Sequence, residues 1–276
     1  MPFTPELTEV EAARAAQYDH AYAKVSRDPL VHDLHRQAIG AEYPEGIEVT
    51  GACTRGTLER ALAELRLPAD GLLVDLGCGL GGPGRWLARA SGARLIGVDV
   101  SQVAVDIAAE SAREYLGAGR ADYRRGSFLA TGLPAGCADG VLAIEALSMA
   151  SDRPAALAEL RRILRPGGRA MFTGAERYGA HEPAGVFRWA PLIAAAGLDV
   201  ASRYVDETRS ARWLAVCALW LRHEAELRER LGDLAEEFLL EAREAPAGWD
   251  VPGLVGVQFV VERSAGDVSV GEHLGG

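Results

Sequence analysis

Residues 72–82 constrain the fold of this chain more than any other segment, because an apolar run passes directly into a turn with almost no side chains. The segment reads LLVDLGCGLGG. Glycine adopts positive φ at little steric cost and lets a ligand approach the backbone closely. A helical pattern follows over residues 85–90, so the segment predicts a strand, a glycine loop and a helix. The spacing of Gly77, Gly79 and Gly82 fits the G-x-G-x-x-G pattern of nucleotide-binding folds.

Two carboxylates narrow what this loop would bind. Asp99 ends the next predicted strand, roughly 20 residues beyond the loop, where such folds place the carboxylate that accepts hydrogen bonds from a ribose. Asp75 precedes the glycines, and its negative charge would repel a pyrophosphate but attract an ammonium or a sulfonium group. The pair therefore favours S-adenosylmethionine (SAM) over NAD as the ligand.

Three segments carry a resemblance to a known family. Residues 74–82 (VDLGCGLGG), residues 97–101 (GVDVS) and the LRPGG turn at 164–168 resemble the class I SAM-dependent methyltransferases. Within that family the chain is similar to the small-molecule branch of bacterial secondary metabolism, which includes sugar and polyketide methyltransferases. The resemblance is strong over residues 70–175 and weaker at both ends.

The resemblance implies an α/β, Rossmann-like class I methyltransferase fold. We expect a seven-stranded, mostly parallel sheet with an antiparallel last strand, and an N-terminal helical cap. The cap or lid is expected over residues 1–66, and the SAM-binding Rossmann-like domain over 67–276, with a helical insert at about 209–245. Neither a repeat nor a clear linker divides the chain, so we expect one compact unit.

The same resemblance, with the motifs above, assigns the cofactor residues. In the family an acidic residue commonly follows the third strand and binds the adenine amino group, but Ser127 stands there in this chain, and Phe128 can flank the ring. Tyr18 and Tyr22 lie on one face of a predicted helix, where they either cap SAM or pack the helix onto the core. The predicted cofactor-binding residues are Tyr18, Tyr22, Asp75, Gly77, Gly79, Gly81, Asp99, Val100, Ser127, Phe128 and Glu145.

The catalytic assignment depends on a departure from the family. Sugar and polyketide O-methyltransferases often carry a histidine pair after the fourth strand, and here Ser148 and Met149 occupy those places. A hydroxyl acceptor would need another general base. The predicted catalytic residues are therefore His181 and Glu176, in the segment after the fifth strand, and Glu145. A loop histidine often has no catalytic role, and Glu145 either anchors the acceptor or satisfies backbone donors at a turn.

Composition excludes several other partners. A net charge of −10 argues against nucleic acid, because binding to a phosphate backbone relies on clustered Lys and Arg. Four cysteines without C-x-x-C spacing predict neither disulfides nor a metal site. We see no signal-peptide pattern, and the longest apolar run, residues 213–221, is too short to cross a bilayer. We therefore expect a cytoplasmic protein without a membrane partner; a homodimer is left open.

Three functions follow from these patterns. The first is a SAM-dependent methyltransferase that methylates carbon, nitrogen or oxygen of a small-molecule natural product or metabolite, with C- or N-methylation favoured by the missing histidine pair. The second is a SAM-binding protein of the same fold that catalyses a non-methylating reaction, such as cyclisation, in a biosynthetic pathway. The third, an NAD-type oxidoreductase, is disfavoured by Asp75 and by the LRPGG turn.

Overall fold

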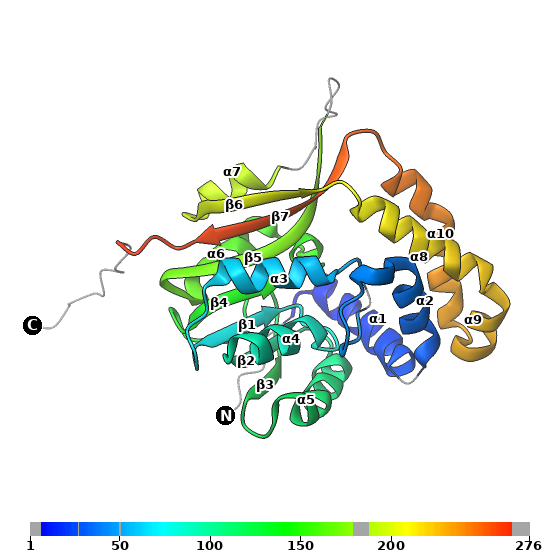
Figure 1. Cartoon of the computed structure of the whole chain (residues 1–276), viewed down its shortest axis with the longest axis horizontal. Coiled ribbons are helices and arrows are strands. Elements are labelled where there is room, and N and C mark those ends of the chain that lie inside the picture. The colour runs from blue at the N-terminus through cyan, green and yellow to red at the C-terminus, as the bar shows by residue number, and fades with distance from the viewer. Residues whose placement is uncertain (1–6, 27, 50, 179–187, 267–276) are drawn as a thin grey trace, which may run out of the picture.

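A computed structural model describes residues 7–26, 28–49, 51–178 and 188–266 (Figure 1). Within these residues seven strands form one sheet in the order β3-β2-β1-β4-β5-β7-β6. The strands from β3 to β5 pair in parallel, whereas β7 is antiparallel to both β5 and β6. The predicted fold class is confirmed. The strands are β1 (Leu72–Leu76), β2 (Arg94–Asp99), β3 (Ala121–Arg125), β4 (Ala138–Ala143), β5 (Leu164–Arg177), β6 (Asp199–Asp206) and β7 (Leu254–Glu262).

Helices cover both faces of the sheet because alternate strand residues are apolar on each side. On one face Leu73 of β1 shares a core with α3 (Arg55–Leu65), α4 (Gly82–Ser91) and α5 (Gln102–Leu116). On the other face Val74 and Leu76 pack in a core with α6 (Arg153–Ile163) and α7 (Trp189–Ala195). This alternation turns the side chain of Asp75 toward the face that carries α4.

A third core lies in a group of helices beside the sheet. It is built from α1 (Glu9–Val25), α2 (Pro29–Ile39), α8 (Arg209–Arg222), α9 (Glu224–Leu231) and α10 (Leu234–Trp249). Figure 1 shows these five helices gathered at one end of the molecule, so the N-terminal helices and residues 209–249 contribute to one helical layer. The helical insert predicted at 209–245 is thus three helices, which break at His223 and at Gly232.

The N-terminal segment predicted as a cap contributes to two parts of the structure. α1 and α2 join the helical layer. The start of α2 as a separate helix is favoured by Asp28, which caps it, and by Pro29 at its first position. α3 instead packs against α4 and β5 on the sheet. A short 3₁₀ helix, η1 (Gly40–Glu42), follows α2.

The topology places the loops that follow β1, β2 and β4 at one edge of the sheet. In open α/β folds ligands bind at the carboxyl ends of the parallel strands. α1 packs beside α5 at this edge, so it lies next to the loops after β1 and β2. None of the described helices is both long enough and apolar enough to cross a membrane.

Candidate functional site

The glycine loop between β1 and α4 needs its glycines for space as well as for conformation. Gly77 has φ of +67°, and a Cβ atom there would lie 2.6 Å from Cβ of Ala146 and 2.9 Å from Cζ of Phe128. The backbone N–H of Gly77 donates to the carbonyl of Val98 (2.8 Å), which joins the loop to β2. Buried Arg85 donates to the carbonyl of Leu80 (2.9 Å) from the first turn of α4. The loop is therefore held as a backbone surface without side chains.

Asp99 at the end of β2 organises the neighbouring loop. Its two carboxylate oxygens accept hydrogen bonds from the backbone N–H groups of Gly79 and Ser101, both at 2.9 Å. Burial raises the pKa of Asp99, although these backbone donors oppose the rise. A carboxylate has about four acceptor positions, so roughly two remain for a ligand.

Asp75 is a buried carboxylate beneath the same loop, only 3% exposed. Burial, with a contribution from nearby Asp99, raises its pKa to about 7. Among the described residues, Oδ2 of Asp75 has no hydrogen-bond partner. Gly84 is the residue that makes room for this carboxylate, because a Cβ atom there would lie 2.4 Å from that oxygen. Because Asp75 also lines the second cavity, its negative charge suits a cationic group of a ligand.

α1 covers the loop from the solvent side. Its Asp19 accepts hydrogen bonds from Oγ of Ser101 (2.6 Å) and from the backbone N–H of Val103 (3.1 Å), which fastens the helix to the start of α5. Tyr18 and Tyr22 stack with their ring centroids 5.8 Å apart. The helix thus presents two aromatic rings toward the glycine loop.

Two adjoining cavities lie between α1, the glycine loop and the end of β4. The first encloses about 690 Å³ and the second about 1190 Å³, both including their open mouths. Four of the predicted cofactor residues line the first cavity but not the second: Asp99, Val100, Ser127 and Phe128. Both are lined by Tyr18, Tyr22, Gly77, Glu145 and Met149.

The structure thus brings together nearly all of the predicted cofactor residues. Asp75 and Gly79 line the second cavity. Gly81 lines neither; it has φ of +77° and precedes α4, and a Cβ atom there would lie 2.8 Å from the hydroxyl of Tyr123. The role of Gly81 is therefore to let the chain enter α4.

Glu145 lies where the two cavities meet, but its carboxylate is engaged. Arg209 of α8 forms an ion pair with it and donates from Nε at 3.1 Å, and the hydroxyl of Thr173 donates to the same oxygen, Oε1, at 3.1 Å. The guanidinium of Arg209 also lies 4.5 Å from the ring centroid of Trp249. Glu145 has φ of +54°, a conformation that is uncommon for a residue with a side chain. The carboxylate of Glu145 is thus held in place as part of the wall of the two cavities.

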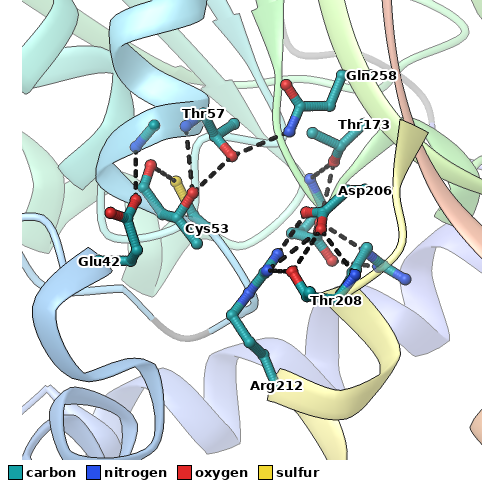
Figure 2. Close-up of polar contacts among 12 residues, drawn as sticks. Glu42, Cys53, Thr57, Thr173, Asp206, Thr208, Arg212 and Gln258 are labelled. Carbon is teal, nitrogen blue, oxygen red and sulfur yellow. Dashed lines mark hydrogen bonds and ion pairs between the residues drawn. The ribbon is translucent and has the colours of Figure 1, made fainter. Parts of the chain in front are cut away.

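A polar network behind Glu145 supports that wall (Figure 2). Gln258 of β7 donates to the hydroxyl of Thr57 in α3 at 3.1 Å. Asp206 at the end of β6 accepts from the hydroxyl of Thr208 at 2.9 Å and pairs with Arg212 of α8. These hydrogen bonds outweigh burial and lower the pKa of Asp206. The first contact joins β7 to α3, and the ion pair joins β6 to α8.

The other two predicted catalytic residues are not brought to these cavities. His181 lies outside the described residues. Glu176 is buried and pairs with Arg203 at 2.8 Å, and it accepts from the backbone N–H of Trp189 at 2.9 Å. Although burial opposes the effect, hydrogen bonds from Tyr178 and Arg203 lower the pKa of Glu176. Its contacts are those of a residue that joins β5 to β6.

The positions of the missing histidine pair do face the site. Ser148 and Met149 lie in a short 3₁₀ helix, η2 (Leu147–Met149), and line the second cavity. No histidine of the described residues lines either cavity. Nor does the described part of the chain hold a group of three or more His, Cys, Asp or Glu side chains placed to bind a metal.

Sequence reasoning missed several residues that line these cavities. Glu11 lines the first, and Arg209, Trp213 and Trp249 line the second. A signal for Glu11 was present, because it lies seven residues before Tyr18 and so on the same helix face. For the residues of α8 and α10 the sequence offers only helical spacing, which does not distinguish a cavity wall from a core.

Part of this chain is similar in sequence to known methyltransferases. Residues 74–172 match a family model described as a methyltransferase domain. A sterol 24-C-methyltransferase from Eremothecium gossypii is 32% identical over 168 residues, which are 58% of this chain and 43% of that protein. The chain spans less than half the length of the curated relatives that it matches.

Two solved structures share the fold. The [4+2]-cyclase SpnF has a TM-score of 0.74 and 20% identity, and the match covers 94% of this chain and 98% of that one. A geranyl diphosphate C-methyltransferase from Streptomyces coelicolor A3(2), solved with Mg²⁺, geranyl diphosphate and S-adenosyl-L-homocysteine, has a TM-score of 0.64 and 19% identity. That match covers 94% of this chain and 100% of the other. At these sequence identities, the two structures show that the fold is shared.

Proposed function

We propose that this chain, whose residues 74–172 form a methyltransferase domain, transfers the methyl group of SAM to a small-molecule acceptor. One observation carries the proposal: two buried carboxylates, Asp75 and Asp99, flank a glycine loop and line the two cavities beside it. That arrangement suits a ligand with a ribose at one end of the loop and a cation at the other. When bound, SAM supplies a methyl group on a positively charged sulfur.

The described residues divide the binding of SAM between the two cavities. Asp99 accepts from the ribose hydroxyls, and Val100, Ser127 and Phe128 enclose the base in the first cavity. Asp75 attracts the ammonium group from beneath Gly77 and Gly79 in the second. Tyr18 and Tyr22 cover the ligand from α1, and Glu145 lies where its middle portion would pass. S-adenosylhomocysteine (SAH), the product, has the same base, ribose and ammonium group and reports on the same contacts.

The residues that line the second cavity narrow the chemical class of the acceptor. Its wall carries the apolar side chains Ile144, Met149, Trp213 and Trp249. Its charged residues are mostly acidic, and Arg209 is the one basic residue among the described residues that line it. Arg209 pairs with Glu145, so much of its charge is already offset, and the net charge of the lining is negative. The acceptor is therefore an apolar molecule that is neutral or cationic, such as a natural product without phosphate groups.

The nucleophile of the acceptor is inferred from the residues that stand in place of the histidine pair. Glu145 is engaged by Arg209 and Thr173, and Ser148 and Met149 cannot take a proton at neutral pH. The enzyme then contributes alignment and the exclusion of water, and the acceptor attacks through its own electron pair. This favours methylation of carbon or nitrogen. For a hydroxyl acceptor, His181 is the proposed base.

Asp75 makes the affinity for the ligand depend on pH. With a pKa of about 7, Asp75 is largely protonated at pH 6 and largely ionised at pH 8. Only the ionised form attracts an ammonium group, so we expect the affinity for SAH to rise roughly tenfold between these pH values, with release of a proton. Calorimetric titration in two buffers of different ionisation enthalpy measures both quantities. Asp75→Asn should bind more weakly at pH 8 and show no such dependence; an equal pH dependence in the variant would exclude Asp75 as its source.

Methyl transfer itself is tested with methyl-labelled SAM and an extract of metabolites separated by ion exchange into anionic, neutral and cationic fractions. We expect label to enter products of the neutral or cationic fractions, with SAH formed in equal amount. Label confined to phosphorylated compounds would contradict the proposed acceptor class. Failure of SAM to bind would contradict the proposed function as a whole.

A non-methylating reaction is the second candidate, favoured by the fold shared with the cyclase SpnF over nearly the whole chain. A chain of this kind would bind SAM and form no SAH with any acceptor fraction. The labelling experiment therefore distinguishes the two candidates, because they differ in whether SAM is consumed.

The partners and the cellular compartment of the enzyme are also proposed from its composition. A net charge of −10 supports activity without nucleic acid, and four free cysteines support a reducing compartment such as the cytoplasm. Sedimentation of the purified chain would show whether it is a monomer or a homodimer.

A further inference from the structure

The first cavity contains a carboxylate that comes from α1 and not from the sheet. Ser127 follows β3, is 2% exposed, and its hydroxyl donates a hydrogen bond to Oε1 of Glu11. The same hydroxyl accepts from the backbone N–H of Leu129 at 2.9 Å. The only proton of the Ser127 hydroxyl is thus committed to Glu11, and the carboxylate acceptor at this end of the cavity belongs to Glu11.

Glu11 is held in one position. It is 8% exposed, and its other oxygen, Oε2, accepts from the backbone N–H of Thr8 at 3.0 Å and from the Thr8 hydroxyl at 2.9 Å. Arg14, one turn later, lines the same cavity but donates to the carbonyl of Met149. Oε2 therefore has two donors, whereas Oε1 has one and keeps an acceptor position for a ligand.

We propose that Glu11 accepts a hydrogen bond from the exocyclic amino group of adenine, so that α1 selects the base of the cofactor. The proposal rests on the proposed binding of SAM, which places Asp99 on the ribose and the base beyond it, beside Ser127 and Phe128. Asp19 supports it, because its bonds to Ser101 and Val103 fasten α1 to the loop that follows the ribose-binding carboxylate. Recognition of the ribose and recognition of the base are then coupled through one helix.

The carboxylate of Glu11 and the amino group of adenine are complementary as acceptor and donor, which makes the selection for adenine strong. An ionised carboxylate accepts hydrogen bonds and cannot donate them, whereas the amino group of adenine donates. Hypoxanthine carries an oxygen in place of that amino group, so two acceptors would face each other in a buried site. A site built to receive a donor rejects an analogue that lacks it, because the buried acceptor is left without a partner.

The test compares two ligands and two proteins. SAH and S-inosylhomocysteine differ at C6, where an oxygen replaces the amino group, and at N1, which gains a hydrogen. The chain is compared with Glu11→Gln by calorimetric titration. We expect the unaltered chain to prefer SAH by at least about tenfold, the effect of a hydrogen bond to a charged group. Glu11→Gln should lose most of that preference, because the amide of Gln can donate to the oxygen of hypoxanthine. A second variant, Glu11→Gln with Ser127→Asp, returns a carboxylate to the position that contacts Oε1 and should restore the preference.

Controls separate base recognition from the stability of the helix. Glu9→Gln changes an exposed carboxylate in the same helical turn and should leave the preference unchanged. Thr8→Ala removes the capping hydroxyl, which also donates to Oε2 of Glu11, and its thermal unfolding shows how far α1 depends on this cap. If Glu11→Gln weakens both ligands equally, or weakens neither, the proposal is overturned. If the unaltered chain binds no SAH, the proposed function fails first.

Discussion

Replacement of Asp99 by alanine is expected to weaken the binding of SAH about a hundredfold, because two charge-assisted hydrogen bonds to the ribose are lost. The carboxylate also accepts from the backbone N–H groups of Gly79 and Ser101, so its removal loosens the glycine loop as well. Asp99→Asn keeps the size of the side chain and one acceptor oxygen, and should lose less affinity than alanine. Calorimetric titration at pH 8 measures all three proteins.

Asp106→Ala provides the matched control for this prediction. Asp106 is an exposed carboxylate in the first turns of α5 and contacts Gln102 of the same helix. Its removal should leave the affinity for SAH unchanged. Thermal unfolding without ligand shows whether Asp99→Ala remains folded. A folded Asp99→Ala that binds SAH as well as the unaltered chain would refute the assignment of Asp99 to the ribose.

Replacement of Arg209 by alanine is expected to lower the free energy of unfolding by about 2–4 kcal/mol, because the carboxylate of Glu145 would remain mostly buried without its cation. The side chains of Glu145 and Arg209 are 21% and 10% exposed. Thr173 would still donate to Glu145, and Trp249 would lose the guanidinium that lies over its ring. Urea unfolding at pH 7 measures the change.

A double-variant cycle tests whether this cost comes from the unpaired charge. Glu145→Gln with Arg209→Ala removes both charges and should recover at least about 1 kcal/mol of the loss. Arg222→Ala, at the exposed end of the same helix, is the control and should cost less than about 0.5 kcal/mol. If Arg209→Ala costs no more than Arg222→Ala, the ion pair does not hold the wall of the cavity.

The cofactor half of the site was largely predictable because it is local in the chain. Gly77, Gly79 and Asp75 lie within one strand–loop–helix unit, and Asp99 ends the next strand. Parallel strands place their carboxyl ends at one edge, so a motif at the end of each strand predicts a shared site. Helical spacing left Tyr18 and Tyr22 either to cap SAM or to pack the helix onto the core. That both line the cavities follows only from the packing of α1.

The acceptor half was not predictable, because its residues come from distant segments. Arg209, Trp213 and Trp249 belong to α8 and α10, whose apolar spacing indicates only that some face is buried. Glu145 looked like a free carboxylate at the end of a strand, and only the packing of α8 shows that Arg209 engages it. The sequence also left Glu176 as a candidate base, whereas its contacts to Arg203 and Trp189 lie away from both cavities.

The amino-acid sequence by itself determined the fold, the glycine loop and the two carboxylates beside it, because the backbone conformation of a strand–loop–helix unit depends on residues close together in the chain. Only the tertiary structure decided which carboxylates keep an open acceptor position and which are engaged. Oδ2 of Asp75 has no partner, Glu145 is held by Arg209, and Glu11 reaches Ser127 from another part of the chain. The reason is physical: a charged side chain is engaged or available according to the donors that packing brings within hydrogen-bond distance, and those donors are far away in sequence.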